Sequence, residues 1–303
     1  MVSVIVFTKD RPMQLHAYLE SLFYFSDLKE SQVFIIYKQN EKISYKNVKK
    51  EYPKCSWILE SNFYDDLLTV INKSSEYILF GCDDVVYKNK ILINYAENLL
   101  LKNEGIFGYS FRLGTNIKPV PKTIMVVDEH IEWNWNDVSE GYYNYPWELV
   151  GTLYRKVDVL SLLNNADEKI TNPNYLEGAF AVNPRNYINR AKLACFNGTN
   201  QALIITVNRV QDTHPMNSVD SSGDTDIYYL NSLYNEKNKK LDIKKISQLK
   251  NNDIHVGSEY FILEGDSFIK WNPVIHSIKM LYKRILFHAK KLVKNIIFLL
   301  KSA

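Results

Sequence analysis

Cysteine is scarce in this sequence of 303 residues, and the three cysteines, Cys55, Cys82 and Cys195, show no Cys-x-x-Cys spacing. This scarcity argues against a disulfide-stapled secreted scaffold and against a zinc-finger type of metal site. A basic amino-terminal region followed by a long apolar run is also missing, because residues 1–7 already have the pattern of a strand. We therefore expect a cytoplasmic protein.

Glycine is sparse as well, with 11 residues, and none of them forms a common phosphate-binding loop. Neither Gly-x-Gly-x-x-Gly nor Gly-x-x-x-x-Gly-Lys-Ser/Thr occurs, which disfavours a dinucleotide-binding Rossmann domain and a P-loop NTPase. Residues 8–12, Thr-Lys-Asp-Arg-Pro, follow the first predicted strand. They are not the glycine-rich basic loop that a sugar-nucleotide pyrophosphorylase would have there.

Neither sign of charge dominates, since 37 lysines and arginines accompany 34 aspartates and glutamates, for a net charge of +3. The positive charge is concentrated at the carboxyl end, where residues 271–303 contain seven basic residues and no acid. The rest of the chain has 30 basic and 34 acidic residues and would repel the phosphates of a nucleic acid. We expect no nucleic-acid partner.

Apolar residues are plentiful, at 46%, and their pattern alternates between strands and helices. Strands are predicted at residues 2–7, 32–37, 56–59 and 77–80, and helices at residues 13–23 and 65–73. Strands that alternate with helices indicate an α/β fold with a mostly parallel sheet. Thr8 or Asp10 is expected to cap the first helix, and Pro12 suits its first turn.

Two adjacent carboxylates, Asp83 and Asp84, follow the apolar strand at residues 77–80, and Gly81 is expected to let the chain turn where that strand ends. Open α/β sheets bind ligands at the carboxyl ends of their strands. Paired carboxylates there suit a hard divalent cation that also holds phosphate oxygens. The alternative is an ordinary turn that closes the strand, since aspartate is common in turns.

Residues 4–12 and 77–84 together resemble the opening strand and the Asp-x-Asp region of GT-A glycosyltransferases, most closely the family 2-like group. The resemblance implies that Thr8 and Arg11 line a nucleotide pocket and that Asp83 faces the ribose or diphosphate. Asp84 would coordinate Mg²⁺ or Mn²⁺. Cys82 stands where the family has its first carboxylate, and a hard cation prefers oxygen to a thiol, so Cys82 is not expected to be a ligand.

Residues 148–155 and 173–178 resemble the later part of the GT-A core. The resemblance implies that Glu177 is the general base of an inverting transfer, and that the late His214 is a further metal or diphosphate ligand. The structural alternatives are that Glu177 is a carboxylate near a helix amino terminus and that His214 is an ordinary surface or core histidine.

Residues 114–148 are expected to form a long irregular excursion with a high density of aromatic rings. We interpret this excursion as the acceptor side of the site, where rings stack on sugars. Trp147, from the excursion, and Arg112, which precedes it, are the candidate acceptor-binding residues. The alternatives are a hydrophobic flap over the core and, for Arg112, a surface ion pair.

Residues 266–303 are predicted to form a basic amphipathic helix behind a catalytic domain at residues 1–265. Apolar residues there fall on one stripe and basic residues on the other face. This pattern is typical of a helix that lies on an anionic membrane, although a helix packed on the core is the alternative. The basic residues interrupt the long apolar run that a spanning segment would need.

Taken together, the sequence predicts a glycosyltransferase that is peripheral to the inner membrane face. It would move a monosaccharide from a nucleotide-sugar, with a UDP-sugar as the first choice, to a saccharide acceptor of a cell-surface or lipid-linked glycan. Two alternatives stay open. One is a catalytically silent relative that binds sugars or nucleotides, and the other is a nucleotidyltransferase.

Overall fold

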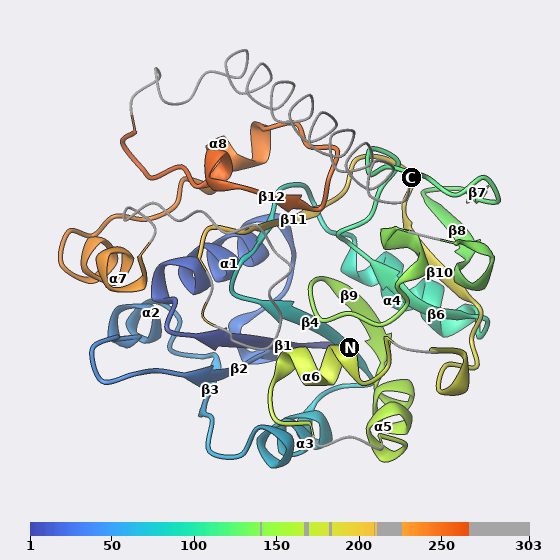
Figure 1. Cartoon of the computed structure of the whole chain (residues 1–303), viewed down its shortest axis with the longest axis horizontal. Coiled ribbons are helices and arrows are strands. Elements are labelled where there is room, and N and C mark those ends of the chain that lie inside the picture. Colours follow the sequence, from blue (N-terminus) through green and yellow to red (C-terminus); the bar gives the residue numbers. More distant parts are fainter. Residues whose placement is uncertain (140, 167–169, 182–183, 209, 211–225, 267–303) are drawn as a thin grey trace, which may run out of the picture.

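The computed structural model of the chain has two β-sheets surrounded by helices (Figure 1). It describes residues 1–139, 141–166, 170–181, 184–208, 210 and 226–266. The predicted amphipathic helix at residues 266–303 lies outside the described residues except for Asp266, and so does the candidate ligand His214. None of the helices in the described ranges is both long enough and apolar enough to cross a membrane.

One half of the large sheet consists of four parallel strands in the order β3-β2-β1-β4. These strands are β1 (Val2–Lys9), β2 (Val33–Lys38), β3 (Ser56–Leu59) and β4 (Tyr77–Cys82). The first seven residues of β1 are buried, because this strand is flanked by β2 and β4 and covered on both faces. The four strands predicted from the sequence are confirmed, with boundaries that differ by one or two residues.

Strand β4 does not turn at Gly81 as we expected from the sequence, because the strand continues through it to Cys82. A Cβ atom at Gly81 would lie 2.2 Å from the hydroxyl oxygen of Tyr18, on the helix that packs against this strand. The glycine therefore serves close packing, and the turn is formed by Asp83 and Asp84.

The other half of the large sheet continues from β4 in the order β9-β6-β10-β8-β7. Its strands are β6 (Ile106–Ser110), β7 (Met125–Val127), β8 (His130–Asn134), β9 (Thr152–Arg155) and β10 (Lys192–Phe196). Among the nine described strands of the large sheet, β8 and β9 are antiparallel to β1, and the others are parallel to it. The predicted mostly parallel α/β fold is confirmed.

The predicted irregular excursion at residues 114–148 is wrong in part. It contains the hairpin β7–β8, which extends the large sheet, and the short 3₁₀ helices η2 (Trp135–Asp137) and η3 (Tyr142–Asn144). Trp133, Trp135 and Tyr143 are at most 2% exposed. These rings are core residues: the Trp133 ring packs against Tyr143, with 5.0 Å between ring centroids, and Nε1 of Trp135 donates to the backbone carbonyl of Arg190 at 2.9 Å.

A second sheet consists of β5 (Val85–Tyr87), β11 (Ala202–Ile205) and β12 (His255–Val256). Helix α1 (Pro12–Phe25) lies between this small sheet and the large one and is therefore buried on most sides (Figure 1). The remaining helices surround the two sheets: α2 (Lys46–Glu51), α3 (Phe63–Lys73), α4 (Ile93–Lys102), α5 (Lys156–Asn164), α6 (Pro173–Gly178), α7 (Ile227–Asn235) and α8 (Ile243–Gln248).

Candidate active site

Three connections meet at the carboxyl-terminal edge of the parallel strands. The loop after β1 contributes Arg11, the turn between β4 and β5 contributes Asp83 and Asp84, and the segment after β11 contributes Asn208. The backbone N–H of Ile205 donates to the carbonyl of Asp84 at 2.8 Å, which fixes the small sheet to this turn. The candidate site therefore lies where the chain passes from one sheet to the other.

Asp83 is 4% exposed, and both of its carboxylate oxygens have hydrogen-bond partners. The Thr8 hydroxyl donates to Oδ2 at 2.7 Å, and Nη1 of Arg11 donates to Oδ1 at 2.9 Å. Burial raises the pKa of Asp83 to about 6, although Arg11 opposes the rise. In this structure Asp83 therefore anchors the loop after β1 through Thr8 and Arg11.

The Thr8 hydroxyl also lies 2.7 Å from the hydroxyl of Tyr45, a buried residue before α2. Because Thr8 uses its only proton on Asp83, Tyr45 donates to Thr8, and Tyr45 in turn accepts the backbone N–H of Arg11 at 3.0 Å. The expected capping of α1 by Thr8 or Asp10 is wrong. Thr8 bonds to Asp83, and Asp10 accepts the backbone N–H of Asn40 at 2.7 Å.

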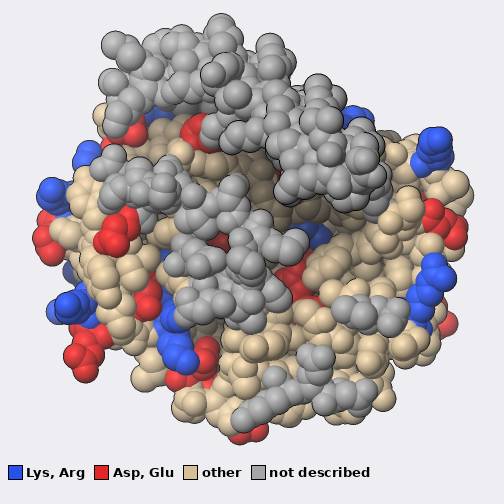
Figure 2. Space-filling model, viewed as in Figure 1, with Lys and Arg blue, Asp and Glu red and all other residues tan. Residues whose placement is uncertain are grey.

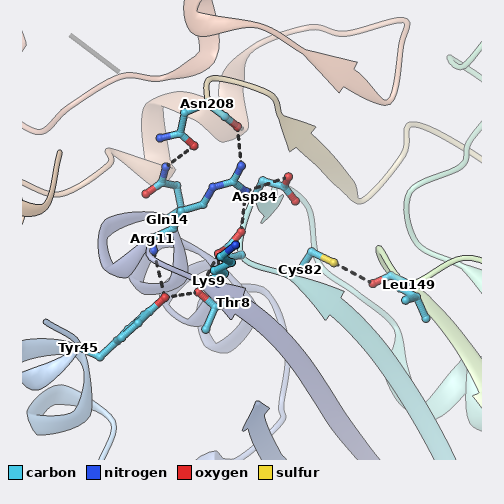
Figure 3. A network of polar contacts seen from close by, with 10 residues as sticks. Thr8, Lys9, Arg11, Gln14, Tyr45, Cys82, Asp84, Leu149 and Asn208 are labelled. Atoms are coloured by element: carbon cyan, nitrogen blue, oxygen red, sulfur yellow. Dashed lines mark hydrogen bonds and ion pairs between the residues drawn. The ribbon is translucent and has the colours of Figure 1, made fainter. Parts of the chain in front are cut away.

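Arg11 bridges the parts of the site with its buried guanidinium. Nη1 lies 3.5 Å from Oδ2 of Asp84 as well as near Asp83, and Nη2 donates to the backbone carbonyl of Asn208 (Figure 3). Burial alone would lower the pKa of Arg11, but Asp83 and Asp84 raise it above its ordinary value. The guanidinium is therefore a fixed positive charge at the carboxyl edge of the sheet.

Asp84 has the more available carboxylate. Its side chain is 25% exposed, and its buried Oδ1 makes no hydrogen bond to the described part of the chain. Burial raises the pKa of Asp84, and Arg11 opposes the rise. A buried carboxylate oxygen without a donor is costly, so the site is suited to a cation or a hydrogen-bond donor at that position.

Cys82 is an uncharged thiol in this environment. Burial, followed by the charges of Asp84 and Asp83, raises its pKa well above the ordinary value, and its Sγ lies 3.8 Å from the carbonyl oxygen of Leu149. An uncharged thiol is a poor ligand for a hard cation. The described residues contain no group of three or more histidine, cysteine, aspartate or glutamate side chains that would hold a metal ion.

A second group of charged residues surrounds Glu177, near the carboxyl end of α6. Burial, followed by the charge of Glu148, raises the pKa of Glu177 to about 7, while Arg112 and a hydrogen bond with Tyr145 lower it. Arg112 and Glu148 form a buried ion pair, with 3.4 Å between Nε and Oε1. The buried pair differs from the surface ion pair considered for Arg112. A carboxyl group with a pKa near 7 is well matched to proton transfer at neutral pH.

The face of the molecule in Figure 2 is hollowed near its centre, and acidic and basic side chains lie at the floor of the hollow. The two groups of residues are close enough to act on one another electrostatically, because the charge of Asp84 is among the causes that raise the pKa of Glu177. The structure therefore brings Glu177 and Arg112 into the neighbourhood of the paired aspartates.

Trp147 is placed differently from our expectation that it stacks on an acceptor. Its ring is 1% exposed and packs against Tyr154 and Phe80, with 5.0 and 5.7 Å between ring centroids. Its Nε1 donates to the backbone carbonyl of Leu176 at 3.0 Å. Trp147 is thus a core residue that joins the segment containing Glu148 to the helix containing Glu177.

A cavity of about 480 Å³ lies at the carboxyl ends of β2 and β3. Lys38 and Glu60, which form an ion pair at 3.2 Å, line it together with Asn62, Phe63 and Ile170. Two strands, β2 and β1, lie between β3 and β4 in the sheet. Neighbouring strands are about 4.8 Å apart, so the cavity lies roughly 14 Å from the paired aspartates along the same edge.

Three residues of the site were missed in the sequence. Tyr45 and Asn208 gave no usable signal, because their roles depend on contacts across 34 and 197 residues of chain. Glu148 did give one, since it is an acid between apolar residues, a position where a carboxylate is buried and needs a partner. His214 lies outside the described residues.

No protein-family model matches the chain. In sequence, the chain is 28% identical to the bifunctional glycosyltransferase pgtA of Dictyostelium discoideum, over 86% of this chain and 39% of that protein. The chain thus spans well under half of the length of this relative. The relation confirms the predicted resemblance to glycosyltransferases.

Solved structures overlap with the chain more loosely. S. aureus TarS 1–349 in complex with UDP-GlcNAc has a TM-score of 0.45 and 16% identity, over 72% of this chain and 61% of that one. A cytidylyltransferase from Leptospira borgpetersenii has a TM-score of 0.38 and 13% identity, over 63% and 77%. The mannosyltransferase PcManGT from Pyrobaculum calidifontis, in complex with GDP-Man and Mn²⁺, has a TM-score of 0.28 and 14% identity, over 38% and 41%. Structural similarity at TM-scores this low does not assign the ligands or activities of those proteins to this chain.

Proposed function

We propose that this chain is a glycosyltransferase that moves a monosaccharide from a nucleotide-sugar to a saccharide acceptor. The observation that carries the proposal is the buried group of Arg11, Asp83 and Asp84 at the carboxyl edge of the sheet. A fixed guanidinium beside an open carboxylate is suited to a diphosphate and its counter-ion. The sequence relation to a glycosyltransferase supports the same function.

The donor would lie along the carboxyl edge. The 480 Å³ cavity beside Lys38 and Glu60 has room for the nucleoside, and the diphosphate would reach Arg11 and Asp84. Lys38 and Glu60 offer both hydrogen-bond donors and acceptors to the edge of a base. A UDP-sugar is the first donor to test.

Mg²⁺ or Mn²⁺ fits this site if the donor supplies most of its ligands. Asp84 Oδ1 is the protein oxygen that would hold the ion, and such ions commonly bind one carboxylate plus substrate phosphates. His214 is proposed as a further ligand from sequence alone. When bound, the ion would supply positive charge to the diphosphate.

The transfer would be inverting, with Glu177 as the general base. The acceptor hydroxyl oxygen forms a bond to the anomeric carbon, and the bond between that carbon and the diphosphate oxygen breaks with its electron pair leaving on the diphosphate. Glu177 takes the hydroxyl proton, which its pKa of about 7 allows. Arg11 compensates the charge that develops on the leaving diphosphate.

The acceptor would bind on the side of Arg112, whose buried guanidinium lies beside Glu148 near Glu177. We further propose that residues 266–303 form a separate basic helix that holds the domain at residues 1–265 on the cytoplasmic face of an anionic membrane. This location would explain a lipid-linked or cell-surface glycan as the acceptor.

A second candidate function is nucleotide-sugar binding without transfer. Cys82 in place of a carboxylate, and the contacts of Arg11 with both aspartates, favour it. A nucleotidyltransferase is a third candidate, and it would release pyrophosphate from a nucleoside triphosphate.

The test is to incubate the protein with UDP- and GDP-sugars, with Mn²⁺ or EDTA, and with a panel of soluble saccharides. Release of nucleoside diphosphate together with a glycosylated product supports the proposal. Donor binding without product supports the silent alternative, and pyrophosphate release from a nucleoside triphosphate supports the nucleotidyltransferase.

A further inference from the structure

Two glutamates, Glu148 and Glu177, are brought together by the chain segments that carry them. The bond from Trp147 Nε1 to the Leu176 carbonyl joins the residues that directly precede Glu148 and Glu177. Glu148 is 1% exposed, and its Oε2 accepts the backbone N–H of Val150. The position of Glu148 is therefore fixed from the backbone side, and its remaining oxygen is left for a cation.

That cation is Arg112. Its side chain is 5% exposed, and its Nε lies 3.4 Å from Oε1 of Glu148. In the described part of the chain Nε of Arg112 donates no hydrogen bond, so the ion pair with Glu148 is the polar contact that Nε makes there. A buried guanidinium requires a carboxylate nearby, because an unpaired charge in the interior costs several kcal/mol.

Arg112 also acts electrostatically on Glu177. The charged and titratable groups that act on Glu177 are Glu148, Arg112, Tyr145 and Asp84. Arg112 lowers the pKa of Glu177, whereas Glu148 raises it. If the charge of Glu148 were removed, the full attraction of Arg112 would fall on Glu177.

We propose that Glu148 is a positioning residue that keeps the Arg112 guanidinium engaged and so leaves Glu177 able to accept a proton. The inference rests on the proposed function, in which Glu177 is the general base. A carboxylate paired with a guanidinium is a weak base, because an opposite charge within about 4–6 Å lowers a carboxyl pKa by roughly 1–3 units.

The first test is a pH titration of the protein labelled with ¹³C at the glutamate carboxyl carbons, followed by NMR. The Glu177 signal is identified by its loss in Glu177→Gln. In Glu148→Gln we expect its midpoint to fall from about 7 by at least about one unit. An unchanged midpoint would overturn the proposal. The matched control is Glu132→Gln, which removes the partly exposed pair with Lys192 on β8 and leaves the midpoint in place.

The second test separates the route through Arg112 from a general effect of the substitution. The double variant Glu148→Gln with Arg112→Gln should return the midpoint towards that of the parent, and a midpoint that stays low overturns the route. Arg112→Gln alone should raise the midpoint, because Glu177 loses the cation that lowers its pKa. Arg112→Gln tests the proposal even if Glu148→Gln does not fold. A Glu177 midpoint that falls or stays unchanged in Arg112→Gln would contradict the proposal.

Kinetics supply the functional readout. The acid limb of the kcat/KM profile of Glu148→Gln should move to lower pH by the same shift as the NMR midpoint. The titration needs no substrate. A parent protein that transfers no sugar therefore refutes the proposed function, while the titration still decides the role of Glu148.

Discussion

Replacing Arg11 with methionine removes the positive charge between Asp83 and Asp84 but keeps much of the apolar stem. In the parent, Nη1 lies 2.9 Å from Asp83 and 3.5 Å from Asp84, and the Arg11 side chain is 10% exposed. Removing one partner of a buried pair costs about 3–5 kcal/mol, because the remaining charges are left uncompensated. We expect that loss in the free energy of unfolding at pH 7.5.

The loss should depend on pH in a defined direction. The pKa of Asp83 in the folded state, about 6, lies above its ordinary value of 3.8. At a pH between these two values, the folded state therefore holds a proton that the unfolded chain has released. Stability from this group therefore falls as the pH rises from about 4 to about 6. Without Arg11 the pKa of Asp83 rises further, so proton uptake should reduce the loss to below about 2 kcal/mol at pH 5.

The assay is urea denaturation at pH 5.0 and pH 7.5, followed by tryptophan fluorescence, since Trp133, Trp135 and Trp147 are buried. The matched control is Arg185→Met, an exposed arginine whose loss should change stability by less than about 0.5 kcal/mol. An equal loss at both pH values, or a loss below about 1 kcal/mol at pH 7.5, would show that Arg11 does not neutralise buried carboxylates.

Four further predictions follow from the site and the fold. Asp84→Asn should weaken donor binding at least about tenfold, because a charge-assisted contact to the diphosphate or its cation is lost; calorimetry that shows unchanged affinity removes Asp84 from the site. Glu177→Gln should lower kcat by about 10²–10⁴ with donor affinity kept, and the parent rate should fall as the pH drops below about 7, since the base must be ionised; an active variant excludes this base. Gly81→Ala should destabilise the protein by about 1–3 kcal/mol in the same urea assay, because the new Cβ meets the Tyr18 hydroxyl, and unaltered stability would contradict the packing described. Truncation after Asp266 should keep activity on a soluble acceptor and abolish sedimentation with anionic vesicles; failure to fold would instead show that the tail belongs to the core.

The strands that carry the paired aspartates were predictable from the sequence, and much of their surroundings was not. Strands β1 and β4 are continuous apolar runs, because both faces are covered, and a continuous run is visible in one dimension. The hairpin β7–β8 was missed because β7 has only three residues, of which Met125 and Val126 are exposed at the sheet edge. Its pairing depends on β10, about 60 residues away in the chain.

The candidate site shows the same division. Asp83 and Asp84 could be proposed because adjacent acids after an apolar strand are a local pattern, and Glu177 was proposed because residues 173–178 resemble the later part of the GT-A core. The burial of Trp147 was not predictable, since an aromatic ring in a loop has the same local pattern whether it faces a ligand or the core. Its neighbours Phe80 and Tyr154 come from two different strands.

The two-residue connection between β4 and β5 also limits how the chain can change over evolution. Side chains alternate between the faces of a strand, so one residue inserted between Cys82 and Val85 would exchange the two faces of β5. Val85 and Tyr87 would then lie on the face of β5 that Val86 occupies now, and Val86 would lie on theirs. The side chains that pack against α1 would thus change places with those on the opposite face of the strand. Insertions and deletions should therefore accumulate in the longer connections and not in this turn.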